Sequence, residues 1–308
     1  LVIEEGDIFN PKKIKRRSVI SKKLKIKRES MVVALGGASN TWGSGSSYFE
    51  EFEMKNIIHS KHLWPVNYNN LIKLYSEIKK KYNINFPQNK KSKIYKDFYE
   101  RSFFANTTPV NFSNFLDKKK IDILLNAKVK YINEKNNISK CEIFFGKKNY
   151  QIQGKKIILC CGCLENIKLL SRSYEERKIK NINFKILGRF FMNHPKINLG
   201  QINFPKKKIN FDKYIFYPNS SNYFGLSLNP KFRKSANALN SFIRFVPKTK
   251  KLNGNRYLKI YNKIYEKFNF NKKNKFIIKF FSEMEPVYSN KVKYDKKKNQ
   301  LIVDYKFS

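Results

Sequence analysis

The chain of 308 residues is 41% hydrophobic and 15% aromatic, and its 65 basic and 23 acidic residues give a formal net charge of +42. This much apolar side chain can fill a sizeable core, which excludes an intrinsically disordered protein. No apolar run reaches the roughly 18 residues of a transmembrane helix, so we expect no transmembrane segment. The expected location is the cytoplasm, and because we expect the true N-terminus to lie upstream of Leu1, the lack of a visible signal peptide does not decide it.

The positive charge by itself does not identify a nucleic-acid-binding protein. Lysine far outnumbers arginine, and the lysines are spread along the whole chain rather than gathered in one segment. Recognition of nucleic acid favours arginine forks and a defined basic surface. We therefore interpret most lysines as solvated surface residues and do not expect nucleic acid as the main partner.

The first residues, LVIEEG (1–6), have the pattern of the end of a buried parallel strand. In a dinucleotide-binding βαβ unit the second strand ends in an acid, and a glycine-rich turn lies about 20 residues upstream. No such turn precedes Leu1, so we expect the sequence to begin inside such a unit. Residues 7–30 follow as a polar, basic connector with a short strand near SVI (18–20).

Residues 31–47 form an uncharged segment in which glycines and serines surround Trp42. Small side chains allow backbone amides to approach a flat ligand closely. The next periodic segment follows Pro65, where Asn69 or Asn70 can cap a helix and apolar residues recur at helical spacing from Leu71 to Ile78. We expect this helix to place its apolar stripe against a core.

From residue 121 the apolar period changes to two, which is typical of strands connected by hairpins. A continuous apolar run then predicts a buried strand, and LENIKLLSRS predicts a helix that begins directly after Gly162. Residues 196–308 alternate apolar and basic side chains, which predicts an antiparallel sheet with loops and a helix at 256–267. The expected strands before this region are 121–125, 128–133, 139–145, 150–153 and the buried strand at 156–161.

The four cysteines do not have the spacing of a metal site. Cys160 and Cys161 are adjacent, and Cys161 and Cys163 lack the two-residue spacer of a zinc knuckle. We interpret this group as small hydrophobic residues at the end of the buried strand, and we expect no metal.

Seven spaced segments together resemble the glucose–methanol–choline (GMC) family of FAD-dependent oxidoreductases, in the branch that oxidises sugars or polyols. Each segment alone is a weak signal, but all seven occur in the family's order. The segments are LVIEEG (1–6), LGGASNTWGSGSS (35–47), WPVNYNNLIKLY (64–75), LLNAKVKYI (124–132), KKIILCCGCLENIKLLSRS (155–173), LGRFFMNHP (187–195) and EMEPVYSNKVKYD (283–295).

The resemblance implies an α/β fold, α+β overall, with an incomplete Rossmann-like FAD-binding domain and an antiparallel-sheet substrate domain. It implies a fragment that lacks the N-terminal glycine loop and the C-terminal catalytic segment. The implied FAD-binding domain comprises residues 1–60 and 119–194, residues 61–118 form a helical lid or connector, and residues 195–308 form the substrate domain.

The implied cofactor is FAD, and the resemblance assigns contacts to residues from four segments. The carboxylate of Glu4 would bind the adenosine ribose, and the main chain of Val129 would bind the adenine edge. The glycine–serine segment would pass the pyrophosphate and reach the flavin ring, where Ser39, Asn40 and Gly43 can supply donors, although Trp42 departs from the family pattern beside Gly43. The implied cofactor-binding residues are Glu4, Gly36, Gly37, Ser39, Asn40, Gly43, Val129 and Gly162.

The implied activity is oxidation of a CH–OH group of an alcohol, sugar or polyol, with hydride passed to flavin N5. A histidine near the C-terminus serves the family as base, but His59, His62 and His194 lie in other segments, so no catalytic residue is assigned. Two alternatives stay open. One is a basic protein that binds nucleic acid or anionic glycans and retains a degenerate flavin lobe. The other is an enzyme divided between two chains.

Overall fold

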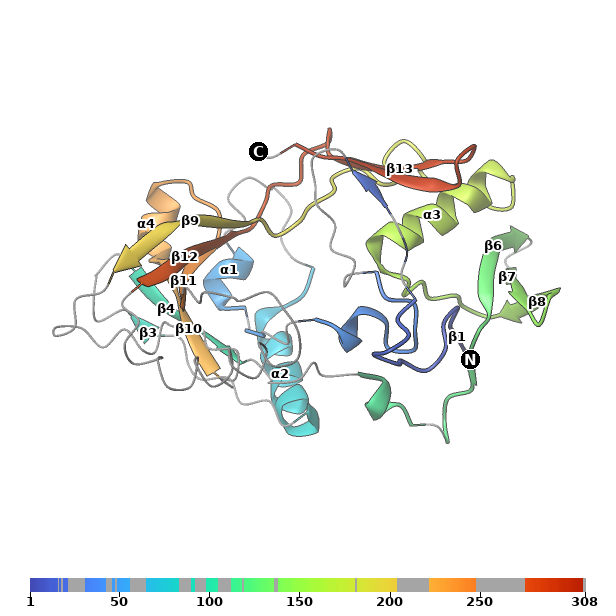
Figure 1. Cartoon of the computed structure of the whole chain (residues 1–308), viewed down its shortest axis with the longest axis horizontal. Coiled ribbons are helices and arrows are strands. Elements are labelled where there is room, and N and C mark those ends of the chain that lie inside the picture. The colour runs from blue at the N-terminus through green and yellow to red at the C-terminus, as the bar shows by residue number, and fades with distance from the viewer. Residues whose placement is uncertain are drawn as a thin grey trace, which may run out of the picture. The chain divides into compact units, whose positions relative to one another are not determined.

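The computed structural model in Figure 1 describes most of the chain, although not all of it. The helices are short or of medium length, and strands dominate. The described residues are 1–15, 17, 19–21, 31–42, 46–47, 49–55, 65–82, 90–91, 98–104, 112–117, 119–135, 138–180, 182–203, 222–247 and 275–306.

The chain divides into two compact units. Unit 1 comprises residues 1–42, 109–192 and 286–308, and unit 2 comprises residues 43–108 and 193–285. These units follow contacts within the chain and not function, so the division into cofactor-binding, lid and substrate domains stays a prediction.

Unit 1 begins with a short pair of parallel strands. Strand β1 (Val2–Ile3) pairs with β5 (Ile123–Leu124). The pairing extends past β1, because the amide of Glu4 donates to the carbonyl of Leu124 at 2.9 Å and the amide of Ala127 donates to the carbonyl of Glu4 at 2.9 Å. The expected parallel strand at the start of the chain is therefore confirmed, although its residues are only half-buried.

An antiparallel three-stranded sheet follows and packs against a helix. The strands are β6 (Lys128–Lys135), β7 (Ile138–Phe145) and β8 (Lys148–Gly154), and the helix is α3 (Gly162–Glu175). One core cluster, of Ile132, Leu169 and Ile179, joins this sheet to α3, and a second, of Ala127, Cys141 and Ile143, packs with Ile3 and Leu124.

A β-bulge in β6 lies where α3 contacts the strand. The register with β7 shifts between Val129 and Tyr131, so Lys130 is the extra residue. The guanidinium of Arg172 donates to the carbonyls of Val129 and Lys130. The hydroxyl of Ser173, which is fully buried, accepts the amide of Ile132 at 2.9 Å. Two adjacent residues of α3 thus bond to the backbone groups around the bulge.

A second small sheet joins the end of the chain to unit 1. Strand β13 (Lys291–Asp295) pairs antiparallel with β14 (Gln300–Asp304), which pairs parallel with β2 (Ile20–Ser21). Figure 1 shows α3 beside the β13–β14 hairpin. The segments at 187–195 and 283–295 meet here. The amide of Val292 donates to the carbonyl of Gly188 at 2.8 Å, and the amide of Phe191 donates to the carbonyl of Asn290 at 3.1 Å.

Unit 2 is built on a six-stranded antiparallel sheet with a small apolar core of Leu226, Phe245 and Phe276. This confirms the expected antiparallel sheet in the second half of the chain, although the expected helix at 256–267 lies outside the described residues. The strand order is β3 (Lys90–Lys91), β4 (Phe98–Phe104), β10 (Asn222–Leu228), β11 (Ser241–Pro247), β12 (Lys275–Ser282) and β9 (Lys196–Asn203), and the helices are α1 (Glu51–Lys55), α2 (Tyr68–Tyr82) and α4 (Pro230–Ser235).

The expected buried strand at 156–161 is wrong. Residues 155–160 belong to no strand, and Ile158 is 84% exposed. Within the described part of the chain no ladder partner pairs with this segment. Instead the side chain of Asn166 accepts the amide of Cys161 at 3.1 Å and donates to the carbonyl of Leu159 at 3.2 Å. An apolar run alone does not supply the neighbouring strand that a sheet requires.

The interpretation of the clustered cysteines as buried residues is also wrong, since Cys160, Cys161 and Cys163 are exposed and only Cys141 of the four is buried.

The prediction that α2 packs its apolar stripe against a core is wrong as well. The helix forms as predicted, but it has no buried residue, and Leu74 and Ile78 are 49% and 38% exposed. Helical spacing establishes which side chains share a face and not what covers that face.

Within its described residues the protein is a mixed α/β structure with few helices and mostly antiparallel strand pairs. The predicted strands at 128–133, 139–145 and 150–153 and the helix after Gly162 are confirmed, and the strand predicted at 121–125 is confirmed only at Ile123–Leu124. The Rossmann-like FAD-binding fold stays a prediction. No helix in the described part of the chain is long and apolar enough to cross a membrane.

The bulge in β6 gives a first test. We expect Ser173→Ala to lower the free energy of unfolding by about 1–3 kcal/mol, because the buried amide of Ile132 loses its partner. Hydrogen exchange should show faster exchange at the Ile132 amide, and urea unfolding should show the loss of stability. The control is Ser76→Ala, whose exposed hydroxyl donates to the carbonyl of Ile72 at 3.2 Å. Equal effects of the two substitutions would contradict the role given to Ser173.

Candidate functional site

The end of β1 is the point at which the predicted cofactor residues begin to meet. The amide of Gly6 donates to Oε1 of Glu4 at 2.7 Å, which folds the carboxylate back over the strand end. Among the described residues no hydrogen bond reaches Oε2 of Glu4. One oxygen of this carboxylate therefore remains able to accept from a ligand hydroxyl.

The glycine–serine segment lies directly against this strand end. Asp7 and Ala34 form a parallel bridge, and the amide of Leu35 donates to the carbonyl of Asp7 at 2.9 Å. The approach is close at Gly6, because a Cβ there would lie 2.4 Å from the carbonyl oxygen of Val33. A glycine at position 6 is therefore what allows the two segments to touch.

The loop itself is a tight turn. Gly36 has φ of 88°, a left-handed conformation that glycine adopts without strain, and a short 3₁₀ helix, Gly37–Asn40, follows it. The hydroxyl of Ser39 donates to the carbonyl of Gly36 at 2.5 Å. The amide nitrogen of Asn40 donates to the carbonyls of Leu35 and Gly37 at 3.0 and 2.9 Å.

These bonds change what the loop can offer a ligand. The family resemblance implies that the side chains of Ser39 and Asn40 donate to the flavin ring. In the structure these donors bond to carbonyls within the loop. By contrast Oδ1 of Asn40 is buried and has no partner among the described residues. An unpartnered buried acceptor is costly, so a ligand donor at this position would be favourable. Gly43 lies outside the described residues.

The remaining predicted residues, Val129 and Gly162, also belong to unit 1. Val129 packs with Ile3 and Leu124 on the core around Ala127, close to the residues that follow β1. Its carbonyl already accepts from Arg172 at 3.1 Å. Gly162 is the first residue of α3.

A network of charges surrounds the strand end. Glu5 pairs with Arg17, and Lys15 and Lys128 lie 3.7 and 3.9 Å from the same carboxylate. Arg17 also lies 3.4 Å from Glu165 in the first turn of α3. Ion pairs as well as backbone bonds therefore connect several parts of the chain. They are its first residues, the segment before the loop, β6 and α3.

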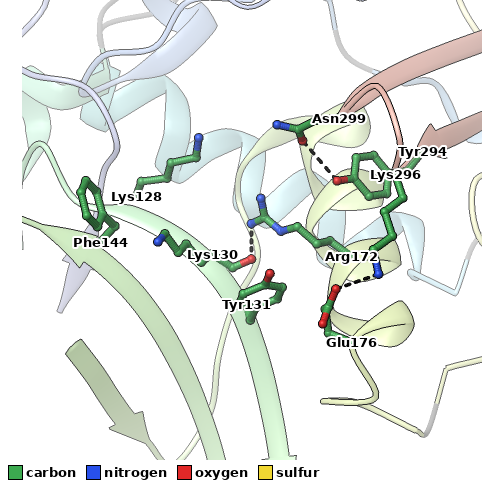
Figure 2. A pocket seen from close by; sticks show the side chains of 9 residues that line it. All are labelled: Lys128, Lys130, Tyr131, Phe144, Arg172, Glu176, Tyr294, Lys296 and Asn299. Atoms are coloured by element: carbon green, nitrogen blue, oxygen red, sulfur yellow. Dashed lines mark hydrogen bonds and ion pairs between the residues drawn. The ribbon is translucent and has the colours of Figure 1, made fainter. Parts of the chain in front are cut away.

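Next to this network is an open hollow of about 620 Å³, which we call the basic hollow. Figure 2 shows Lys128, Lys130 and Phe144 on one side, Tyr294, Lys296 and Asn299 on the other, and Arg172 between them. Among the described residues, four cationic side chains and one carboxylate, that of Glu176, line it. The described residues of the lining are Lys128, Lys130, Tyr131, Phe144, Arg172, Glu176, Tyr294, Lys296 and Asn299.

The cations of the basic hollow differ in how they are balanced. Lys296 pairs with Glu176 at 2.9 Å, and Lys128 is 3.9 Å from Glu5. Among the described residues neither Lys130 nor Arg172 forms an ion pair with a carboxylate. Lys130 instead donates to Oδ1 of Asn149 at 3.0 Å.

Two further observations show that positive charge is crowded here. Burial lowers the pKa of Lys128, and the charges of Arg17, Arg172 and Lys15 lower it further. The Nε of Arg172 is buried without a hydrogen-bond partner among the described residues.

The bulge explains why the sequence did not reveal this site. Regular alternation would place Lys130 and Tyr131 on opposite faces, but the extra residue brings both to the lining of the hollow. One signal was present, since the tetrapeptide KVKY occurs at 128–131 and again at 291–294. Both copies lie in strands that border the hollow.

Among the described residues, no histidine contributes to a second candidate site. His59 and His62 lie outside the described residues, and His194 is exposed. In unit 2 the buried side chains of Glu53 and Arg233 lie 4.0 Å apart, and Asn240 donates to Glu53 at 2.7 Å. These contacts connect α1 to α4 and stabilise unit 2, so we assign them a structural role. No group of three metal-ligating side chains occurs among the described residues.

No protein-family model matches the chain, and no curated protein matches its sequence. The function must therefore be argued from the residues that the structure brings together.

The contact at Gly6 gives a second test. We expect Gly6→Ala to lower the free energy of unfolding by about 1–3 kcal/mol, because the new methyl group would overlap the Val33 carbonyl and separate the two segments. The Leu35 amide should then exchange faster in hydrogen-exchange measurements. Gly154→Ala is the control, since its Cβ would lie 3.4 Å from the nearest backbone oxygen, that of Lys156. A stability of Gly6→Ala equal to that of the control would show that the close approach is not required.

Proposed function

We propose that the protein is an FAD-dependent oxidoreductase that acts on the CH–OH group of an alcohol, sugar or polyol. The observation that supports this most is the convergence around the end of β1. Backbone hydrogen bonds join three segments there that are distant in sequence. They are the segment of Glu4, the segment that leads into Gly36–Asn40 and the residues before Val129. These are the segments to which the family resemblance assigns the dinucleotide.

The residues present fit part of such a cofactor well. Oε2 of Glu4 can accept from a ribose hydroxyl while Oε1 stays bound to Gly6. The buried Oδ1 of Asn40 offers an acceptor to a donor on the cofactor, such as the imide N–H of a flavin. Gly36 and Gly37 carry no side chain that would keep a ring from the backbone.

Other assignments need adjustment. Because the side-chain donors of Ser39 and Asn40 bond within the loop, contacts from the backbone are the better candidates for the flavin edge. The carbonyl of Val129 is shared with Arg172, so the adenine contact there would use the remaining lone pair.

When bound, FAD would supply the hydride acceptor for alcohol oxidation. The task of the chain's own residues is then to bind the ribose, to hold the loop rigid and to exclude water from the ring face. No base for the hydroxyl proton is assigned among the described residues.

The alternative of a basic binding protein has one specific observation in its favour, which is the basic hollow. Its lining would attract an anion with or without a flavin at the end of β1.

The flavin proposal is tested by titrating the purified chain with FAD and following quenching of flavin fluorescence. We expect Glu4→Gln to weaken FAD binding about tenfold, because a charged hydrogen bond to the ribose becomes a neutral one while the contact with Gly6 is kept. Glu77→Gln, at an exposed position of α2, removes the same charge and should leave binding unchanged. Absence of FAD binding by the unmodified chain, or equal affinities of the two variants, would refute the proposal.

A further inference from the structure

We propose that the basic hollow is a binding site for a nucleoside phosphate, separate from the proposed flavin site. Lys128 and Lys130 would bind the phosphate oxygens, and the ring of Phe144 would form one wall for the base. The proposal does not depend on flavin binding, since it is argued from the lining of the hollow alone.

Charge is the first argument. Lys130 and Arg172 have no carboxylate partner among the described residues, and burial together with neighbouring cations lowers the pKa of Lys128. A phosphate group carries the negative charge that would relieve this repulsion, and it accepts several charge-assisted hydrogen bonds at once.

Rigidity is the second argument. Arg172 is fixed by two carbonyls of β6 and lies over the ring of Tyr131, with 5.1 Å from its guanidinium carbon to the ring centroid. Lys130 is fixed by Asn149, and its ammonium lies 4.6 Å from the centre of the Phe144 ring. Cations that are already held in place lose less conformational entropy when an anion binds.

Size and surface indicate more than a simple anion. A hollow of about 620 Å³ is within the range of small-molecule sites and is much larger than a single phosphate. Three aromatic residues, Tyr131, Phe144 and Tyr294, line it together with the amide of Asn299. Aromatic rings bind the flat face of a nucleobase regardless of its identity.

The basic hollow uses side chains of β6 that the proposed flavin site does not use. The side chain of Val129 packs into the core with Ile3, whereas Lys128 and Lys130 line the hollow. The hollow and the proposed flavin site therefore share the strand but not the side chains.

The test is isothermal titration of the full chain with ADP and with pyrophosphate at fixed ionic strength. We expect ADP to bind more tightly than pyrophosphate. The double variant Lys128→Met/Lys130→Met should bind ADP at least about tenfold more weakly. The control Lys79→Met/Lys80→Met removes the same charge from exposed positions of α2 and should bind ADP as the unmodified chain does.

Two further variants separate the base contact and the flavin site. Phe144→Leu should weaken ADP about tenfold and leave pyrophosphate unchanged, because only the base loses a stacking surface. The tenfold loss of ADP affinity caused by Lys128→Met/Lys130→Met should also appear in a Glu4→Gln background, in which the proposed flavin site is weakened. Circular dichroism and urea unfolding should match the unmodified chain for every variant, so that a lost fold is not taken for a lost site.

Several results would overturn the proposal. They are no ADP binding by the unmodified chain, equal affinities in the two double variants, and pyrophosphate that binds as tightly as ADP. A loss of ADP binding in Glu4→Gln would place the nucleotide at the flavin site instead. Displacement of ADP by a long single-stranded oligonucleotide that binds far more tightly than ADP would indicate a nucleic-acid interface.

Discussion

The bond between α3 and the bulge in β6 is the interaction on which both candidate sites depend. The extra residue Lys130 leaves backbone groups out of regular register, and Arg172 and Ser173 bond to the groups on either side of it. Buried backbone groups without partners are costly, so this pair of residues fixes the helix on the strand. The first turn of α3 and its charges near Glu5 are positioned as a consequence.

The same bulge gives β6 two functions on two faces. One face keeps Val129 and Ile132 in the core, where the strand supports the residues that follow β1. The other directs Lys130 and Tyr131 toward the basic hollow. A regular strand would have separated these two side chains. The crowded positive charge is thus a local consequence of backbone geometry and not only of a net charge of +42.

The composition of the glycine–serine segment predicted its close backbone contact but not its hydrogen bonds. Its small residues correctly indicated a close backbone approach, and the contact of Gly6 with Val33 is of this kind. Composition did not indicate which donors stay free. Ser39 and Asn40 bond within their own turn, because short polar side chains readily reach carbonyls three to five residues earlier.

The local elements could be predicted from the sequence: the meander at 128–154, the helix after Gly162 and the parallel strand at the start of the chain. Alternation and helical spacing are properties of neighbouring residues, so they can be read along the chain. The partners and the cover of these elements depended on the fold. Residues 156–161 did not become a buried strand, α2 gained no buried face, and a bulge assembled the basic hollow, because partners, burial and register depend on segments distant in sequence.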